Sequence, residues 1–118
     1  MKNFVQPGET IDVAAPYDRL SGQAALVGAG IFGVCASDAL SGVTVPLQRR
    51  GVFTNMAKAT GAAWVQGDLL YWDNTAKNFT KTSAGNKLVG VAYVPVGTTA
   101  PASGDTTGAV LLPGTLPT

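Results

Sequence analysis

The sequence has no histidine and a single cysteine, Cys35. Without histidine, the chain lacks the side chain most used for proton transfer near neutral pH and the commonest metal ligand. A single cysteine cannot form an internal disulfide, and Cys35 lies in an apolar run, where a buried small hydrophobic side chain is expected. These absences exclude Cys-His chemistry, and the sequence predicts no metal site and no cofactor.

Charge is scarce as well, since only 13% of the residues are Asp, Glu, Lys or Arg and the formal net charge is +1. Arg49 and Arg50 form the only basic pair, whereas nucleic-acid binding needs clustered cations to neutralise phosphates. No apolar run approaches the roughly 18 residues of a membrane span, and the amino terminus is too short and polar for a signal peptide. We expect a cytosolic product that binds neither nucleic acid nor membrane. Because 46% of the residues are hydrophobic, we expect part of the apolar surface to meet another protein.

Seven acidic residues could in principle supply a carboxylate pair for glycoside hydrolysis. Most of them stand beside Gly, Ser, Thr or Asn, where an aspartate hydrogen-bonds its own backbone in a turn. Asp68 and Asp73 lie at the two ends of an apolar segment and are typical of residues at which a strand begins or ends. A hydrolase built on Asp68 or Asp73 would need a paired acid and base, and none can be named. The sequence therefore predicts that the protein is not an enzyme.

The sequence does contain 15 glycines and seven prolines, spread along its length. They separate short β-type segments, which suits tight turns and disfavours long helices. We predict a single all-β domain over residues 1–118, a compact small β-barrel or sandwich of short strands. The expected strands span residues 9–14, 24–27, 31–36, 43–48, 51–53, 68–72, 88–94 and 109–112. One short helical turn is expected over residues 54–60, between a capping Thr54 and a terminating Gly61.

The ends of the predicted domain and one loop have separate signals. Residues 1–8 are expected to form an extended arm, and residues 113–118 an irregular tail. Residues 73–80 predict a polar hairpin whose return strand carries Phe79.

Three pairs of segments repeat in the same order: 22–27 with 67–72, 31–36 with 88–93, and 41–47 with 107–112. Two related halves would then share a core. A small β protein rich in Gly and Val also yields such matches by chance, and the sequence leaves both readings open. Gly33 and Gly90, inside strand patterns, indicate bulges or close backbone approach.

Both tryptophans lie within residues 61–73. Tyr71 and Trp72 are adjacent, so on a strand they face opposite sides, one toward the core and one toward solvent or a partner. We expect Trp72, or whichever of the two points outward, to contact another subunit, because aromatic side chains dominate interface energetics. A stacking surface for sugars or bases is the alternative.

Ten short segments carry a family resemblance that covers nearly the whole chain: residues 2–10, 15–17, 26–28, 31–34, 51–53, 58–59, 61–64, 66–68, 71–73 and 88–92. In this order, which includes Gln66-Gly67-Asp68 and Tyr71-Trp72-Asp73, they resemble a family of small tailed-phage and prophage proteins. Its members are described as capsid cement or head decoration proteins, and others are often labelled predicted recombinases of the RecA/RadA type. A recombinase needs a nucleotide cradle, a DNA-binding surface and a much larger α/β domain, none of which this sequence contains.

The resemblance implies a structural virion protein, made in the host cytoplasm and bound to the outside of a phage head shell. There it would stabilise contacts between subunits of the major capsid protein, as homotrimers at three-fold or quasi-three-fold positions. We expect the arm to add to a neighbouring subunit by edge pairing, with Phe4 and Val5 as anchors and Pro7 at the same candidate interface. The alternative function is a carbohydrate-binding or host-attachment module that exposes Tyr71 and Trp72.

Overall fold

The computed structural model describes residues 8–118, which form nine β-strands and no helix. The all-β prediction is confirmed. The strands are β1 (Thr10–Ala14), β2 (Ala24–Val27), β3 (Ile31–Cys35), β4 (Thr44–Gln48), β5 (Arg50–Ala57), β6 (Leu69–Asp73), β7 (Asn78–Thr80), β8 (Lys87–Ala92) and β9 (Thr107–Pro113).

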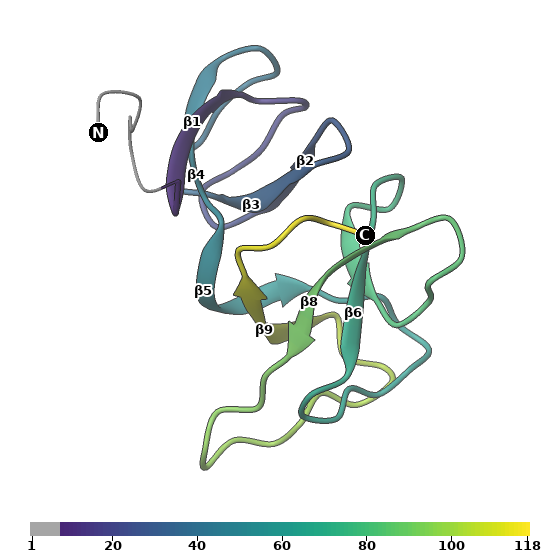
Figure 1. Ribbon diagram of the computed structural model, residues 1–118. Helices are drawn as coiled ribbons and strands as arrows, with labels where there is room; N and C mark the ends of the chain where they lie inside the picture. The colour runs from purple at the N-terminus through teal and green to yellow at the C-terminus, as the bar shows by residue number, and fades with distance from the viewer. Residues whose placement is uncertain (1–7) are drawn as a thin grey trace.

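The strands form two antiparallel sheets, which lie one above the other in Figure 1. The first sheet has the order β1-β4-β3-β2, and the second has the order β5-β9-β8-β6-β7. The second sheet curls until its outer strands meet, because Lys58 and Phe79 form a parallel bridge and Ala59 N donates to Phe79 O at 2.8 Å. The second sheet therefore approaches a closed barrel, whereas the described part of the first sheet stays open between β1 and β2.

The helical turn expected over residues 54–60 is wrong, because β5 continues through Ala57. The pairing of β5 with β9 is interrupted between Phe53 and Met56, and Asn55 takes a φ of 56° there. Asparagine tolerates this left-handed conformation, and the extra residues of a β-bulge absorb the irregularity. Pairing with β9 thus outweighs the local helix propensity, and it turns Met56 into the core.

The strand order of the first sheet recurs in the second, where β5-β9-β8-β6 takes the places of β1-β4-β3-β2 and β7 is additional. The match extends to single hydrogen bonds. Gly22 N donates to Cys35 O at 2.8 Å, and Gly67 N donates to Ala92 O at 2.9 Å. The first two predicted segment pairs are therefore confirmed as structural repeats, and we call residues 10–48 and 50–113 the first and second halves.

Gly33 and Gly90 occupy the same place in the two halves. A Cβ atom at Gly33 would lie 2.5 Å from Gln48 O, and one at Gly90 would lie 2.6 Å from Leu111 O. The predicted close backbone approach is confirmed at both glycines. Val34 and Val91, which directly follow these glycines, are therefore equivalent. Val34 pairs with Gln48 and Val91 pairs with Leu111, so Gln48 in the first half corresponds to Leu111 in the second. The third predicted segment pair, residues 41–47 with 107–112, is wrong in register, because it made Val45 rather than Gln48 the counterpart of Leu111.

An aromatic cluster joins the two halves. The Phe32 ring lies 5.3 Å from Trp72 and 5.7 Å from Phe79, measured between ring centroids. The outward face of β2 and β3 thus packs on the core of the second half. The opposite face of the same strands packs on a smaller cluster around Val45 and Leu47, so β2 and β3 are buried on both sides.

Two smaller expectations are confirmed, for Phe79 and for Cys35. Phe79 is carried into the core by β7, the return strand of the hairpin that follows β6. Cys35 is a buried small side chain, and burial raises the pKa of its thiol. After Pro113 the chain has no further strand, and it returns to the second sheet, where Thr118 N donates to Leu88 O at 3.0 Å.

Candidate functional site

The candidate interface residues Phe4, Val5 and Pro7 lie outside the described residues, which begin at Gly8, the last residue of the expected arm. Arg49, between β4 and β5, holds this residue and the start of the tail together. Its Nη1 donates to Gly8 O at 2.8 Å, and its Nη2 donates to Gly114 O at 3.2 Å. One guanidinium therefore fixes where both terminal segments leave the two sheets.

Beside Gly8 lies the outer edge of β1. Arg49 N donates to Glu9 O and Ala15 N donates to Val43 O, so the odd-numbered residues of this strand face β4. The backbone groups of Thr10, Asp12 and Ala14 therefore point away from β4. Within residues 8–118 no strand pairs with this edge. An added strand from another chain could pair there.

The outer edge of β2 is blocked by side chains. Leu26 N donates to the Tyr17 hydroxyl at 3.0 Å, and Arg19 Nη1 donates to Ala24 O at 3.2 Å. Tyr17 is itself held between two cations, since Arg19 Cζ lies 5.1 Å and Lys77 Nζ 4.3 Å from its ring centroid. Occupied backbone groups cannot pair with an incoming strand, so β2 offers no open edge.

Trp72 is 2% exposed, and its Nε1 donates to Asn74 Oδ1 at 3.0 Å. The alternation expected for adjacent residues is confirmed, with Trp72 in the core and Tyr71 half-buried on the opposite face. Trp72 is thus not exposed to a subunit or a sugar, which corrects its place among the candidate interface residues. Tyr71 keeps its place as a candidate, and the two rings do not form a joint stacking surface.

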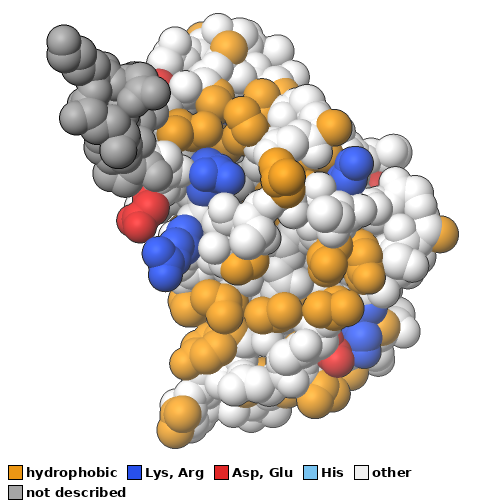
Figure 2. All heavy atoms as spheres, viewed as in Figure 1, with side chains coloured by type: hydrophobic (Ala, Val, Ile, Leu, Met, Phe, Trp, Pro, Cys, Tyr) orange, Lys and Arg blue, Asp and Glu red, His pale blue; other side chains and the backbone are white. Residues whose placement is uncertain are grey.

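The outward face of the second sheet carries a continuous apolar surface, which we call the outer band. Its central row crosses four strands, because Val52 pairs with Leu111, Leu111 with Val91, and Val91 with Leu69. Tyr71 and its partner Leu88 extend the band along β6 and β8. Val52, Leu69 and Leu111 are 49%, 53% and 37% exposed. In Figure 2 hydrophobic side chains form this band across the middle of the molecule, over β5, β9, β8 and β6.

A hollow of about 460 Å³ lies at one end of the outer band. Leu69 and Val91 of the band line it together with Leu116 of the tail. Its walls are mainly aliphatic, so it suits an apolar side chain of a partner.

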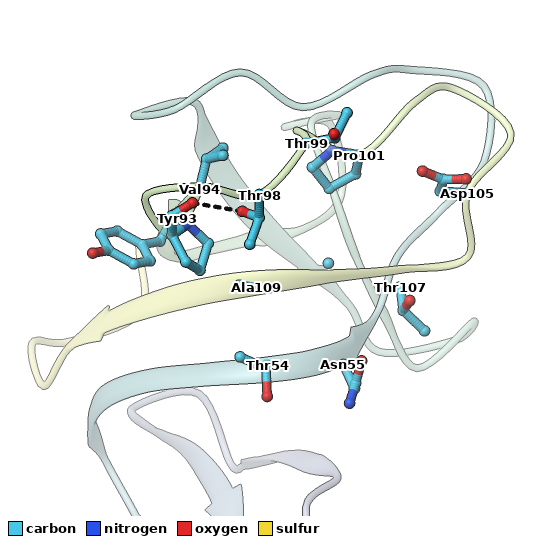
Figure 3. A pocket seen from close by; sticks show the side chains of 12 residues that line it. Thr54, Asn55, Tyr93, Val94, Thr98, Thr99, Pro101, Asp105, Thr107 and Ala109 are labelled. Atoms are coloured by element: carbon cyan, nitrogen blue, oxygen red, sulfur yellow. Dashed lines mark hydrogen bonds between the residues drawn. The ribbon is translucent and has the colours of Figure 1, made fainter.

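A second cavity, of about 230 Å³, lies between β5, β9 and the loop that precedes β9 (Figure 3). Its polar lining is partly engaged by the loop itself. Thr98 Oγ1 donates to Pro95 O at 2.6 Å, the dashed line in Figure 3, and the Asp105 carboxylate accepts from Ala102 N at 2.9 Å. These contacts stabilise the loop, and the cavity shows no paired acid and base.

Asp68 and Asp73 accept hydrogen bonds from the backbone of their own turns, as predicted. Asp68 Oδ2 accepts from Val65 N at 2.7 Å and lies 3.0 Å from Lys81 Nζ, and together these donors lower the pKa of the Asp68 carboxyl. Asp73 Oδ1 accepts from the backbone of Thr75 and Ala76. No group of three or more Cys, Asp or Glu side chains within residues 8–118 could hold a metal ion. The same residues include no helix that is long and apolar enough to cross a membrane.

A pair of matching loops exposes two further apolar side chains. Ser21 N donates to Asp38 Oδ1 and Ser41 N donates to Asp18 Oδ1, each at 2.7 Å. The two loops are thereby locked to each other. At their tips Leu20 and Leu40 are 60% and 67% exposed.

A family model described as phage cement protein matches residues 5–112. The chain belongs to the phage cement protein family. The searches of curated proteins and of solved structures found no match. Family membership confirms the resemblance seen in the sequence, and it assigns the chain a structural role in the phage, associated with the capsid.

The matched range of this cement protein contains every residue of the outer band, together with Arg49 and the outer edge of β1. Sequence analysis selected Tyr71 but missed the rest of the band, because its members are ordinary strand residues until the register sets them side by side. The two matching loops could have been recognised in the sequence, because each contains an aspartate, Asp18 or Asp38, two positions before the same tripeptide Leu-Ser-Gly. Nothing in the sequence marked Arg49 as the residue that bonds both Gly8 and Gly114.

Proposed function

We propose that this protein is a capsid decoration protein that binds the outside of a phage head shell and stabilises contacts between major capsid protein subunits. The observation that carries the proposal is the family match over residues 5–112. The proposal treats residues 1–118 as one structural domain that associates with itself, with the homotrimer as the expected form. Its location is the capsid surface.

The arm is the proposed link to neighbouring subunits of the head shell. Seven residues precede Gly8, and at about 3.3 Å per residue a fully extended segment of that length would reach about 23 Å. That length is enough to lie along a strand of five residues. Phe4 and Val5 would supply apolar anchors, while backbone pairing along an exposed edge supplies register. Because Arg49 fixes Gly8, the arm would start from a defined point on each copy.

Stabilisation follows from selective binding. A partner that binds only the expanded shell lowers its free energy by RT ln(1 + [L]/Kd), about 2.7 kcal/mol per site when the free concentration is about a hundred times Kd. A shell offers many such sites, so modest affinity per copy is sufficient. Preference for the expanded state requires a surface that the compact precursor shell does not present.

Co-sedimentation with empty expanded heads of the phage that encodes the protein tests the proposal. We expect the full chain to sediment with the heads and to raise the temperature at which they disrupt. We expect the variant lacking residues 1–7 to stay folded, judged by near-ultraviolet circular dichroism of its tryptophans, and to remain in the supernatant. A full chain that does not bind heads would contradict the function, and a truncated chain that binds undiminished would contradict the role of the arm.

A matched pair of arm variants separates the anchors from arm length. The double variant Phe4→Ser with Val5→Ser should weaken head binding, because it removes the apolar anchors from the arm. The double variant Lys2→Ser with Asn3→Ser changes as many residues in the same segment and should bind as the parent does. Equal binding by the two double variants would show that the arm does not act through Phe4 and Val5.

A further inference from the structure

The two halves of the chain pack through one interface with two different sides. On one side is the outward face of β2 and β3, which carries Leu26, Phe32 and Val34. On the other side is the part of the second sheet where its outer strands β5 and β7 meet, which we call the seam. There Trp72 and Phe79 contact Phe32. Because the halves repeat each other, each side of this interface has a counterpart elsewhere in the chain.

The counterpart of the first side is the outer band. The strand registers place Val34 and Val91 at equivalent positions, since they pair with Gln48 and Leu111 respectively. By the same registers, the cross-strand pair of Leu26 and Phe32 in the first half is equivalent to the cross-strand pair of Tyr71 and Leu88 in the second. Leu26, Phe32 and Val34 are covered by the second half, whereas Tyr71, Leu88 and Val91 lie on a face that nothing within residues 8–118 covers apart from the tail at one end.

The counterpart of the second side is the open end of the first sheet. In the first half, Ile11 and Val13 take the places of Phe53 and Met56 of the second half, and Val27 takes the place of Trp72. The strand β7, which seals the second sheet, has no counterpart in the first. Four aliphatic side chains of the smaller cluster are therefore only partly buried, and we call them the mouth: Ile11, Val13, Val27 and Ile31.

We propose that the outer band of one copy covers the mouth of a second copy, in the arrangement by which the two halves pack within the chain. The residues that define the band and the mouth are all uncharged, and each surface matches a side of an interface that the chain already forms. The hollow beside Leu69 and Val91 leads to Leu116, whose Cδ2 lies 3.8 Å from the place of a Cβ on Gly30, in the turn between β2 and β3. The band thus adjoins the internal interface that it would repeat.

The contact is head-to-tail, because each copy presents one band and one mouth. Such contacts close into a ring when the rotation between copies closes, and otherwise they continue as a filament. The proposal rests on the self-association in the proposed function and names the surfaces that make it. It does not involve the head shell, so the assembly forms with purified protein alone.

Light scattering coupled to size-exclusion chromatography tests the band and the mouth. We expect the full chain to form a closed assembly larger than a monomer. Leu69→Glu, on the band, and Val27→Glu, on the mouth, should each raise the concentration for half-assembly about tenfold or more, since a charge would be buried in an apolar contact. Val96→Glu is the matched control, because Val96 is fully exposed on a loop and belongs to neither the band nor the mouth, and it should assemble as the parent does.

Mixing the two variants separates this geometry from a symmetric one. The Leu69→Glu protein keeps an intact mouth and the Val27→Glu protein keeps an intact band, so the mixture should form one-to-one dimers. Thermal unfolding of each variant must first show a folded protein. Val27→Thr, a milder change, replaces Val27→Glu where the latter is unfolded, and it should assemble less well than Val96→Glu.

Four outcomes would overturn the proposal. The first is a full chain that remains a monomer, and the second is a folded Leu69→Glu protein that assembles as the parent does. The third is a mixture of folded single variants that stays monomeric, which would point to bands that pair with each other. The fourth is loss of assembly on deleting residues 1–7, which would make the arm the occupant of the mouth. Head binding is measured separately, so a variant that assembles but does not sediment with heads bears on the proposed function alone.

Discussion

The Tyr17 hydroxyl donates a hydrogen bond to Asn74 Oδ1 at 2.9 Å, across the interface between the two halves. The same oxygen accepts from Trp72 Nε1 at 3.0 Å, and the Tyr17 hydroxyl accepts from Leu26 N at 3.0 Å. Asn74 lies in the hairpin between β6 and β7, which only the second half possesses. The added hairpin therefore supplies both the seam of the second sheet and the polar contact that orients the first half on it.

Asn74→Ala should destabilise the protein by about 1–2 kcal/mol, because it leaves the indole N–H of Trp72 without its acceptor. Urea unfolding followed by tryptophan fluorescence measures the change. Asn86→Ala is the control, since the Asn86 amide donates only to Thr82 O in an exposed loop. We expect the control to lose less than about 0.5 kcal/mol. Equal losses in the two variants would show that the Tyr17 to Asn74 contact has no special role.

Gly33→Ala and Gly90→Ala should each destabilise the protein by about 1–3 kcal/mol, because the added methyl group would press on a backbone oxygen of the neighbouring strand. The affected oxygens, Gln48 O and Leu111 O, lie 2.5 and 2.6 Å from the two Cβ positions. Gly104→Ala is the control, because nothing lies within 4 Å of its Cβ position. Thermal unfolding compares the three variants, and similar losses at all three positions would contradict the close approach.

Sequence patterns predicted the strands well where burial alternates or is continuous on both sides. The strands predicted over residues 31–36 and 68–72 match β3 and β6 to within one residue, because their apolar residues and flanking glycines leave few alternatives. The pattern failed over residues 54–57, where local propensity favours a turn of helix. There the hydrogen bonds of β9, far away in the chain, decide the conformation, and local propensity carries no information about them.

The candidate site was predicted only in part for a similar reason. Adjacency showed that Tyr71 and Trp72 face opposite sides, but not which side is the core, because that depends on where the first half packs. The outer band depends on the registers of four strands that are separated by long loops. The third repeat was set out of register because a longer loop precedes β9 than precedes β4, and glycines in both loops allow several alignments.

Asp68→Asn should lower the melting temperature near pH 6, and this difference from the parent should shrink as the pH falls. The pKa of the Asp68 carboxyl is lowered in the folded protein by Val65 N–H and Lys81, so the ionised form is favoured by folding. That contribution is present above the unfolded-state pKa of about 3.9 and is lost as pH falls through the lower folded pKa. Asparagine can still accept from Val65 N but cannot pair with Lys81. A difference between the two proteins that stays constant from pH 6 to pH 2 would contradict this account.

Arg49→Lys should loosen the roots of both terminal segments while it leaves the sheets intact. A lysine carries one ammonium group and cannot reproduce the planar fork that donates to Gly8 O and Gly114 O together. Hydrogen exchange measured by mass spectrometry should therefore quicken in peptides that contain residues 8–10 and 114–118, and not in peptides from β3 or β8. Arg50→Lys is the control, because the Arg50 to Glu9 ion pair is solvent-exposed and contributes little. Faster exchange at only one terminus would show that Arg49 does not couple the two, and equal effects of the two variants would show that charge alone suffices.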